Sequence, residues 1–142
     1  MNDTLSRYEV DSLIHSCDCY VSLHRAEGFG LGIAEAMALG RPVIVTHWSG
    51  NIDFTNPNNA ACIGYELRQL DQDYGPYKAG QYWAEPNIDE AAQWMQRLAD
   101  APAFARQLGT QAQQTIAEQL SPRAIGQQIL QRLHAIQAKR QP

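Results

Sequence analysis

The sequence has no long apolar run and no basic segment at its start. Its longest apolar stretches are 33–39, which contains Glu35, and 43–45, far short of the ~20 residues that a membrane span needs. The first residues, Met-Asn-Asp-Thr, lack the basic start and apolar middle of a signal peptide. We therefore expect no transmembrane helix and no secretion, and a cytoplasmic protein with at most peripheral membrane contact.

Cysteine is also scarce. Cys17, Cys19 and Cys62 are odd in number and lack C-x-x-C spacing, which argues against a disulfide framework and against a zinc site. We expect them to behave as small buried hydrophobic residues. No metal-ligand spacing links His15, His47 and His134 either. The sequence thus predicts no metal cofactor.

Charge is low and slightly acidic. Only 18% of the 142 residues are charged, and 15 acidic against 11 basic residues give a net charge of −4 and a pI near 5.5. The arginines are scattered singly, whereas a nucleic-acid-binding protein gathers its basic residues into a stripe. A chain with 44% hydrophobic residues can bury a core. We expect one compact domain, residues 1–142, that does not bind nucleic acid.

The local pattern of the first half alternates between helical and β-prone segments. We expect helices at 5–16 and 33–39, strands at 19–23, 42–46 and 60–67, and loops at 48–59, with one helical turn at 51–54, and at 71–82. The unbroken β-branched run at 42–46 is typical of a parallel sheet that is covered on both faces.

The remainder, 87–138, is predicted to be helical. Asn87 should cap the first helix, with Glu90 completing a capping box, and Ser121 and Pro122 should open the last helix. We expect the apolar stripes of these helices to be core: Ala91, Trp94, Met95 and Leu98 in the first, and Ile125, Ile129, Leu133 and Ile136 in the last. A further helix is expected at 102–118.

A glycine-rich turn separates the strand at 19–23 from the helix at 33–39. The first amides of a helix lack partners and carry the positive end of its dipole, and glycines let a ligand approach them. However, Gly28-x-Gly30-x-Gly32 is not a dinucleotide fingerprint, because Glu35 stands where the next glycine belongs. From the glycines alone, phosphate binding and a merely tight turn are equally supported.

Two carboxylates flank this turn, with Glu35 eight residues after Glu27. Together with Phe29, Leu31 and the later Ala-Met-Ala-x-Gly-x-Pro-Val-Ile, they resemble the E-x7-E region of family 4 retaining glycosyltransferases. The resemblance extends over residues 5 to about 138. It implies the later part of the C-terminal, donor-binding domain of a two-Rossmann-domain (GT-B) enzyme. The expected fold is α/β, a partial Rossmann-like three-layer domain with a short parallel sheet of about three strands and C-terminal helices.

The resemblance also implies roles for matching residues. Glu35 would accept hydrogen bonds from the ribose hydroxyls of a nucleotide sugar, and Glu27 would face the donor sugar near its anomeric carbon, as the catalytic residue. The backbone amides of Phe29, Gly30 and Leu31, beside Gly28, would receive sugar or diphosphate oxygens. Without the resemblance, the two acids would be a loop carboxylate and a partner of the helix dipole.

Two further positions are weaker candidates. His24 and Arg25 follow the strand at 19–23, and ligands of open α/β sheets bind at the carboxyl ends of strands. They would contact the donor phosphate, or else form a solvated strand end. Residues 48–51 would border the sugar pocket or simply pack as a loop. The implied reaction needs no metal.

The chain departs from the family pattern at its start. The strand–helix units that supply a basic pair for the diphosphate, and the N-terminal acceptor domain, have no counterpart here. We therefore expect a fragment or half of a split enzyme, in which the strand at 19–23 has an open edge. That edge should bind the missing domain, a separate chain or a second copy.

Two functions remain open at this point. The first is the donor-binding part of an enzyme of polysaccharide biosynthesis that transfers a sugar, with retention, from a nucleoside diphosphate to a glycan or lipid-linked acceptor. The second is a non-catalytic module that binds nucleotide sugars or docks onto a partner. An epimerase or phosphorylase of the same architecture is a distant third.

Overall fold

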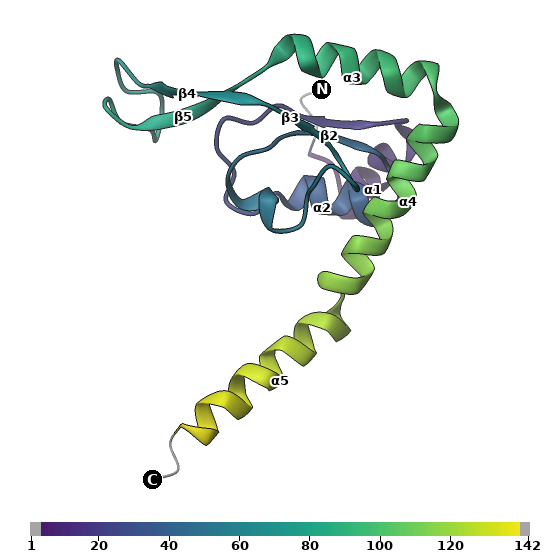
Figure 1. Cartoon of the computed structure of the whole chain (residues 1–142), viewed down its shortest axis with the longest axis vertical. Helices are drawn as coiled ribbons and strands as arrows, with labels where there is room; N and C mark the ends of the chain where they lie inside the picture. The colour runs from purple at the N-terminus through teal and green to yellow at the C-terminus, as the bar shows by residue number, and fades with distance from the viewer. Residues whose placement is uncertain (1–3, 140–142) are drawn as a thin grey trace.

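A short parallel sheet lies at the centre of the molecule. The computed structural model describes residues 4–139, and its sheet has the order β1 (Tyr20–Ser22), β2 (Val43–Thr46), β3 (Ala61–Ile63). Both strand pairs are parallel, and the strand order places β1 at one edge of the sheet (Figure 1). The α/β fold, the three-stranded parallel sheet and the open edge at β1 confirm the expectations from the sequence.

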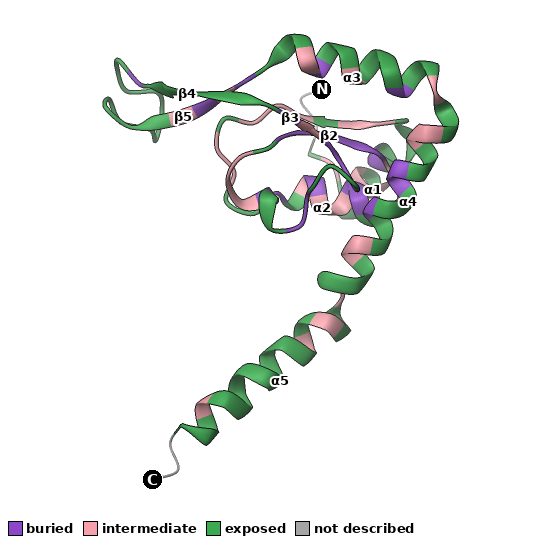
Figure 2. Cartoon of the chain, viewed as in Figure 1, coloured by how far each residue is buried: buried purple, intermediate pink, exposed green. Residues whose placement is uncertain are grey.

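Helices cover the two faces of the sheet. On one face, α1 (Arg7–Ser16) and α2 (Leu31–Ala38) enclose Val43 and Val45. On the other face, Ile44 packs against α3 (Ile88–Asp100) and α4 (Pro102–Gln119). All four residues of β2 are buried because the side chains of a strand alternate between two covered faces (Figure 2).

Side-chain caps begin α1, α3 and α5 (Pro122–Ala138), and the sequence predicts the last two of them. Ser6 and Glu9 form a complete capping box at α1, and Ser121 accepts a hydrogen bond from the amide of Ala124 at the start of α5. Asn87 caps α3 through the amide of Glu90. The predicted capping box there is only half formed, because the Glu90 carboxylate accepts from the amide of Gly64, 2.8 Å away.

The strand predicted at 60–67 is wrong as one element. The chain turns at Gly64, so that β3 ends at Ile63 and β4 (Tyr65–Gln69) leaves the central sheet. β4 pairs antiparallel with β5 (Tyr82–Pro86), a strand that the sequence does not predict. Every residue of β4 is exposed, so the strand has no buried face in this fold.

Burial is also predicted wrongly for Cys17, for Met95 and for the apolar stripe of α5. Cys17 is exposed, and Met95 of α3 is 52% exposed because α3 packs over β2 and β3 rather than over β1. Ile129 is 55% exposed, and α5 contains no buried residue because it extends away from the body (Figure 2). Within residues 4–139, no helix combines the length and the apolarity that crossing a bilayer requires.

Candidate functional site

The turn after β1 presents the bare N-terminus of α2. Gly30 begins the helix in a left-handed conformation with φ of +96°, and no side chain caps the helix there. The amide of Ala34 donates to the carbonyl of Gly30, so the amides of the first turn before it have no intrahelical partner. Phe29 and Leu31 on either side are 40% and 67% exposed. The turn therefore offers unpaired donors and a positive partial charge to solvent.

The loop after β2 holds this turn in place. The amide of Gly50 and the hydroxyl of Ser49 both donate to the carbonyl of Glu27, at 3.1 and 2.6 Å. A Cβ atom at Gly50 would overlap the carbonyl of Gly28, so only glycine permits this approach. The 3-10 helix η1 (Ser49–Asp53) thus fixes the backbone on which the predicted donor site depends.

His24 joins the same two loops. Its Nε2 lies 3.0 Å from the carbonyl of Trp48 and 3.1 Å from Oδ1 of Asn51, which is fully buried. Because both neighbours are acceptors, Nε2 carries the proton, and Nδ1 accepts from the hydroxyl of Ser22 at 3.1 Å. Both ring nitrogens are therefore engaged within the chain, and Asn51 is part of the packing of this loop.

Tyr20 of β1, which the sequence does not predict as a site residue, lies beside the glycine turn. A Cβ atom at Gly32 would lie 2.5 Å from the Tyr20 hydroxyl, so this hydroxyl touches the first turn of α2. Burial, followed by the negative charges of Glu27 and Glu35, raises the pKa of Tyr20. The charges of Glu27 and Glu35 both act on the Tyr20 hydroxyl, which lies beside the first turn of α2.

Glu35 is already paired within the chain. Its Oε1 accepts from Nη1 of Arg7, in α1, at 2.6 Å, and the Arg7 guanidinium also contacts Asp11. The bond to Glu35 is the largest cause of the raised pKa of Arg7. By contrast, the only hydrogen bond recorded for the Glu27 carboxylate within the described chain comes from the adjacent amide of Gly28. The two acids thus differ: the charge of Glu35 is paired with Arg7, whereas the Glu27 carboxylate is available to a ligand.

Arg25 points to the hairpin. Its Nε and Nη2 donate to the two oxygens of Glu85, at 2.8 and 2.6 Å, and its guanidinium lies 4.9 Å from the ring centre of Trp83. The carbonyl of Arg25 accepts from the amide of Ala84. A contact between Arg25 and donor phosphate stays a prediction, and it would compete with this two-pronged ion pair.

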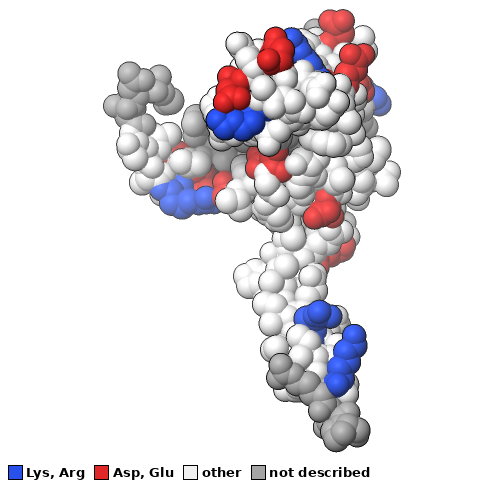
Figure 3. All heavy atoms as spheres, turned by 90° about the vertical axis from the view of Figure 1, so that its left-hand side faces the viewer, with Lys and Arg blue, Asp and Glu red and all other residues white. Residues whose placement is uncertain are grey.

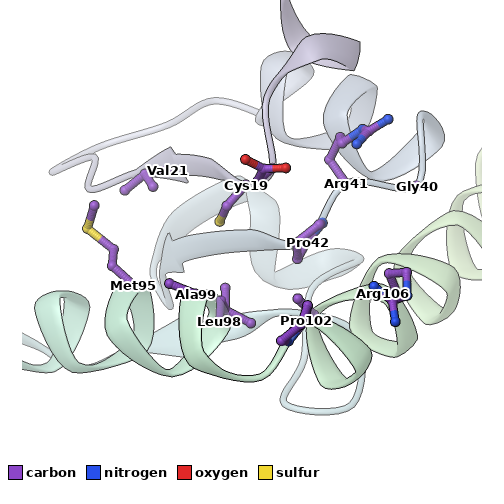
Figure 4. Close-up of a pocket in the computed structure, with 12 residues that line it drawn as sticks. Cys19, Val21, Gly40, Arg41, Pro42, Met95, Leu98, Ala99, Pro102 and Arg106 are labelled. Atoms are coloured by element: carbon purple, nitrogen blue, oxygen red, sulfur yellow. The ribbon is translucent and has the colours of Figure 1, made fainter.

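A cavity lies at the other end of the strands. It has a volume of about 640 Å³ and opens between β1 and the helices α3 and α4 (Figure 4). Cys19 and Pro42, which precede β1 and β2, line it together with Met95 and Leu98. Residues 4–139 contain no cluster of three or more side chains suited to hold a metal ion.

The sequence of this region matches a known family. Residues 3–70 match the family Glycosyl transferases group 1. The match covers just under half of the chain and contains the glycine turn, both carboxylates and the loop after β2. The hairpin strand β5 and helices α3 to α5 lie outside it. A search of curated proteins found no match.

The group 1 match and the geometry concern the same turn. Four of the predicted residues, Gly28, Phe29, Gly30 and Leu31, form the turn and the start of α2, with Glu27 and Glu35 beside it. Tyr20 and Arg7 adjoin these candidate residues, and only the fold could reveal them, because their contacts join segments 12 and 28 residues apart. The one sequence signal that bears on Arg7 is that no Lys or Arg lies within four residues of Glu35.

Proposed function

We propose that this chain is the donor-binding part of a retaining group 1 glycosyltransferase. A nucleotide sugar would bind at the carboxyl ends of β1 and β2, against the first turn of α2. The observation that carries the proposal is the uncapped helix N-terminus behind the left-handed Gly30, flanked by Glu27 and Glu35. Unpaired amides at a helix N-terminus bind phosphate oxygens, and the group 1 match supports glycosyl transfer as the activity.

The proposed roles follow the chemistry of each group. The amides of Phe29, Gly30 and Leu31 receive diphosphate or sugar oxygens and stabilise the charge that develops on the leaving diphosphate. Glu35 accepts from the ribose hydroxyls through Oε2, since Arg7 occupies Oε1. Glu27 faces the sugar near its anomeric carbon. The acceptor would be a glycan or a lipid-linked sugar, and no metal is required.

A non-catalytic binding module is the second candidate. The observation that favours it is the engagement of the nearby cations: Arg7 is held by Glu35 and Arg25 by Glu85. A leaving diphosphate would therefore meet backbone dipoles without a free basic side chain from these two residues. We expect the isolated chain to bind donor nucleotides without turning them over.

Calorimetry with UDP, GDP and ADP tests binding, and an assay of sugar-nucleotide hydrolysis tests turnover. Dissociation constants at or below the millimolar range, about −4 kcal/mol, would support the site, whereas no binding of any of the three would refute it. Nucleosides that lack the diphosphate should bind more weakly. Glu118→Ala is a matched control for Glu35→Ala, because Glu118 lies on α4 and its carboxylate bonds Gln114 on the same helix.

We also propose that a second copy of the chain covers the open edge of β1. In the parallel pair with β2, Tyr20 donates to Pro42, so the backbone groups of Val21 point away from the sheet. Val21 is 39% exposed at the border of the 640 Å³ cavity. Two such edges related by a two-fold axis pair antiparallel through the same residue of each copy.

A further inference from the structure

Helix α5 has an apolar side that nothing in the described chain covers. Ile125, Ile129, Leu130 and Leu133 are 36%, 55%, 56% and 48% exposed. The helix meets the rest of the described chain mainly at its start, beside α4, and then extends away from the body (Figure 1). Apolar side chains gathered on an exposed helix indicate an interaction surface.

The charge of this segment is opposite to that of the rest of the chain. Residues 122–142 contain four basic and no acidic residues, whereas residues 1–121 contain all fifteen acidic residues and the other seven basic ones. On the face drawn in Figure 3, the outer part of the projecting segment shows Lys and Arg without Asp or Glu. The chain thus has an acidic body and a basic amphipathic arm.

The basic residues border the apolar side. With 3.6 residues per turn, Ile125, Ile129 and Leu133 lie above one another on one side of α5. Arg132 falls along one border of this side and Arg123 along the other. Long basic side chains in such positions can bury their carbon stems while their charged ends reach a polar boundary. The opposite side of the helix carries Gln127, Gln128 and Gln131 among alanines.

The cavity of a second copy of the chain is a poor binding site for this helix. The 640 Å³ cavity between β1 and the helices α3 and α4 is lined by Arg41 and Arg106 against the single acid Asp18. A basic helix entering that cavity would meet like charge. An anionic lipid surface instead supplies an apolar layer for the apolar side of α5 and negative head groups for Arg123 and Arg132 at its borders.

We propose that α5 binds the surface of an anionic membrane, with its apolar side in the boundary between head groups and acyl chains and its axis along that surface. The acidic body is repelled by such a surface, so it faces away and α5 is the point of attachment. This inference uses a helix outside the group 1 match and does not depend on the proposed nucleotide site.

Flotation of the full chain with vesicles tests the proposal. Binding is expected to vesicles of equal parts phosphatidylglycerol and phosphatidylcholine, to weaken with added salt, and to be much weaker with phosphatidylcholine alone. Arg123→Gln combined with Arg132→Gln should lower the partition coefficient about 25-fold, because each cation near the surface contributes roughly fivefold, ~1 kcal/mol. Ile129→Gln combined with Leu133→Gln should abolish binding.

Matched control variants distinguish an effect of α5 on vesicle binding from an effect of the net charge of the chain. Arg68→Gln combined with Arg106→Gln removes the same charge from the body and should leave vesicle binding unchanged. Circular dichroism checks that each variant keeps its helices. Equal binding to neutral and anionic vesicles, no binding at all, or self-association in solution that Ile129→Gln and Leu133→Gln abolish would each overturn the proposal.

Discussion

Replacing Gly30 by alanine tests the geometry of the turn on which the proposed site depends. With φ at +96°, an L-residue there costs about 1–2 kcal/mol of backbone strain. The new Cβ would lie 3.1 Å from Cδ1 of Ile33 and 3.4 Å from Cβ of Asn51 and Cζ of Phe54. Because the end of the Ile33 side chain can shift, we expect a total loss of about 2 kcal/mol in the free energy of unfolding.

Urea unfolding followed by circular dichroism measures this loss, and in a domain of this size the melting temperature should fall by several degrees. Gly28→Ala is the matched control, since no atom lies within 4 Å of its Cβ position and its φ is not positive. It should lose less than ~1 kcal/mol. Equal stability of the two variants would refute the left-handed start of α2.

Three further predictions concern the site, the hairpin and the edge. Glu35→Ala should weaken nucleotide binding by roughly 1–3 kcal/mol in calorimetry while the chain stays folded; normal binding would assign Glu35 to the helix alone. Arg25 lowers the pKa of Glu85, so their ion pair stabilises the hairpin above the usual pKa of a glutamate and is lost as the pH falls through the lowered pKa. The fluorescence of Trp83 should change in that acid range, and Glu85→Gln should remove the change. Light scattering should show a dimer that Val21→Lys dissociates, and a monomeric wild-type chain would contradict pairing at the edge.

The sequence predicts the central sheet well because its signals are local. The β-branched run at 42–46 identifies β2, and Asn87 and Ser121 mark the starts of their helices through caps within three residues. The glycine turn is recognisable for the same reason: the left-handed position falls on a glycine. Local chemistry therefore suffices for the backbone of the candidate site.

Other features depend on contacts between distant segments. The hairpin is held by Arg25 and Glu85, 60 residues apart, and β4 carries no buried face that a pattern could reveal. The pairing of Arg7 with Glu35 needs α1 to lie against α2. The apolar stripe of α5 has the period of a core helix, yet periodicity cannot tell a core from a surface that another partner covers.

The attachment of the hairpin has a consequence for its motion. It contacts the body near one end, through the Arg25 carbonyl, the Arg25–Glu85 pair, the stacking of Arg25 on Trp83 and the packing of Trp48 on Tyr65. The segment 71–81 at the other end bonds mainly to itself. A two-stranded ribbon alone is only marginally stable in water. The hairpin should therefore open as a separate cooperative unit: amide hydrogens of 71–81 exchange with solvent while those of β2 stay protected until the whole chain unfolds.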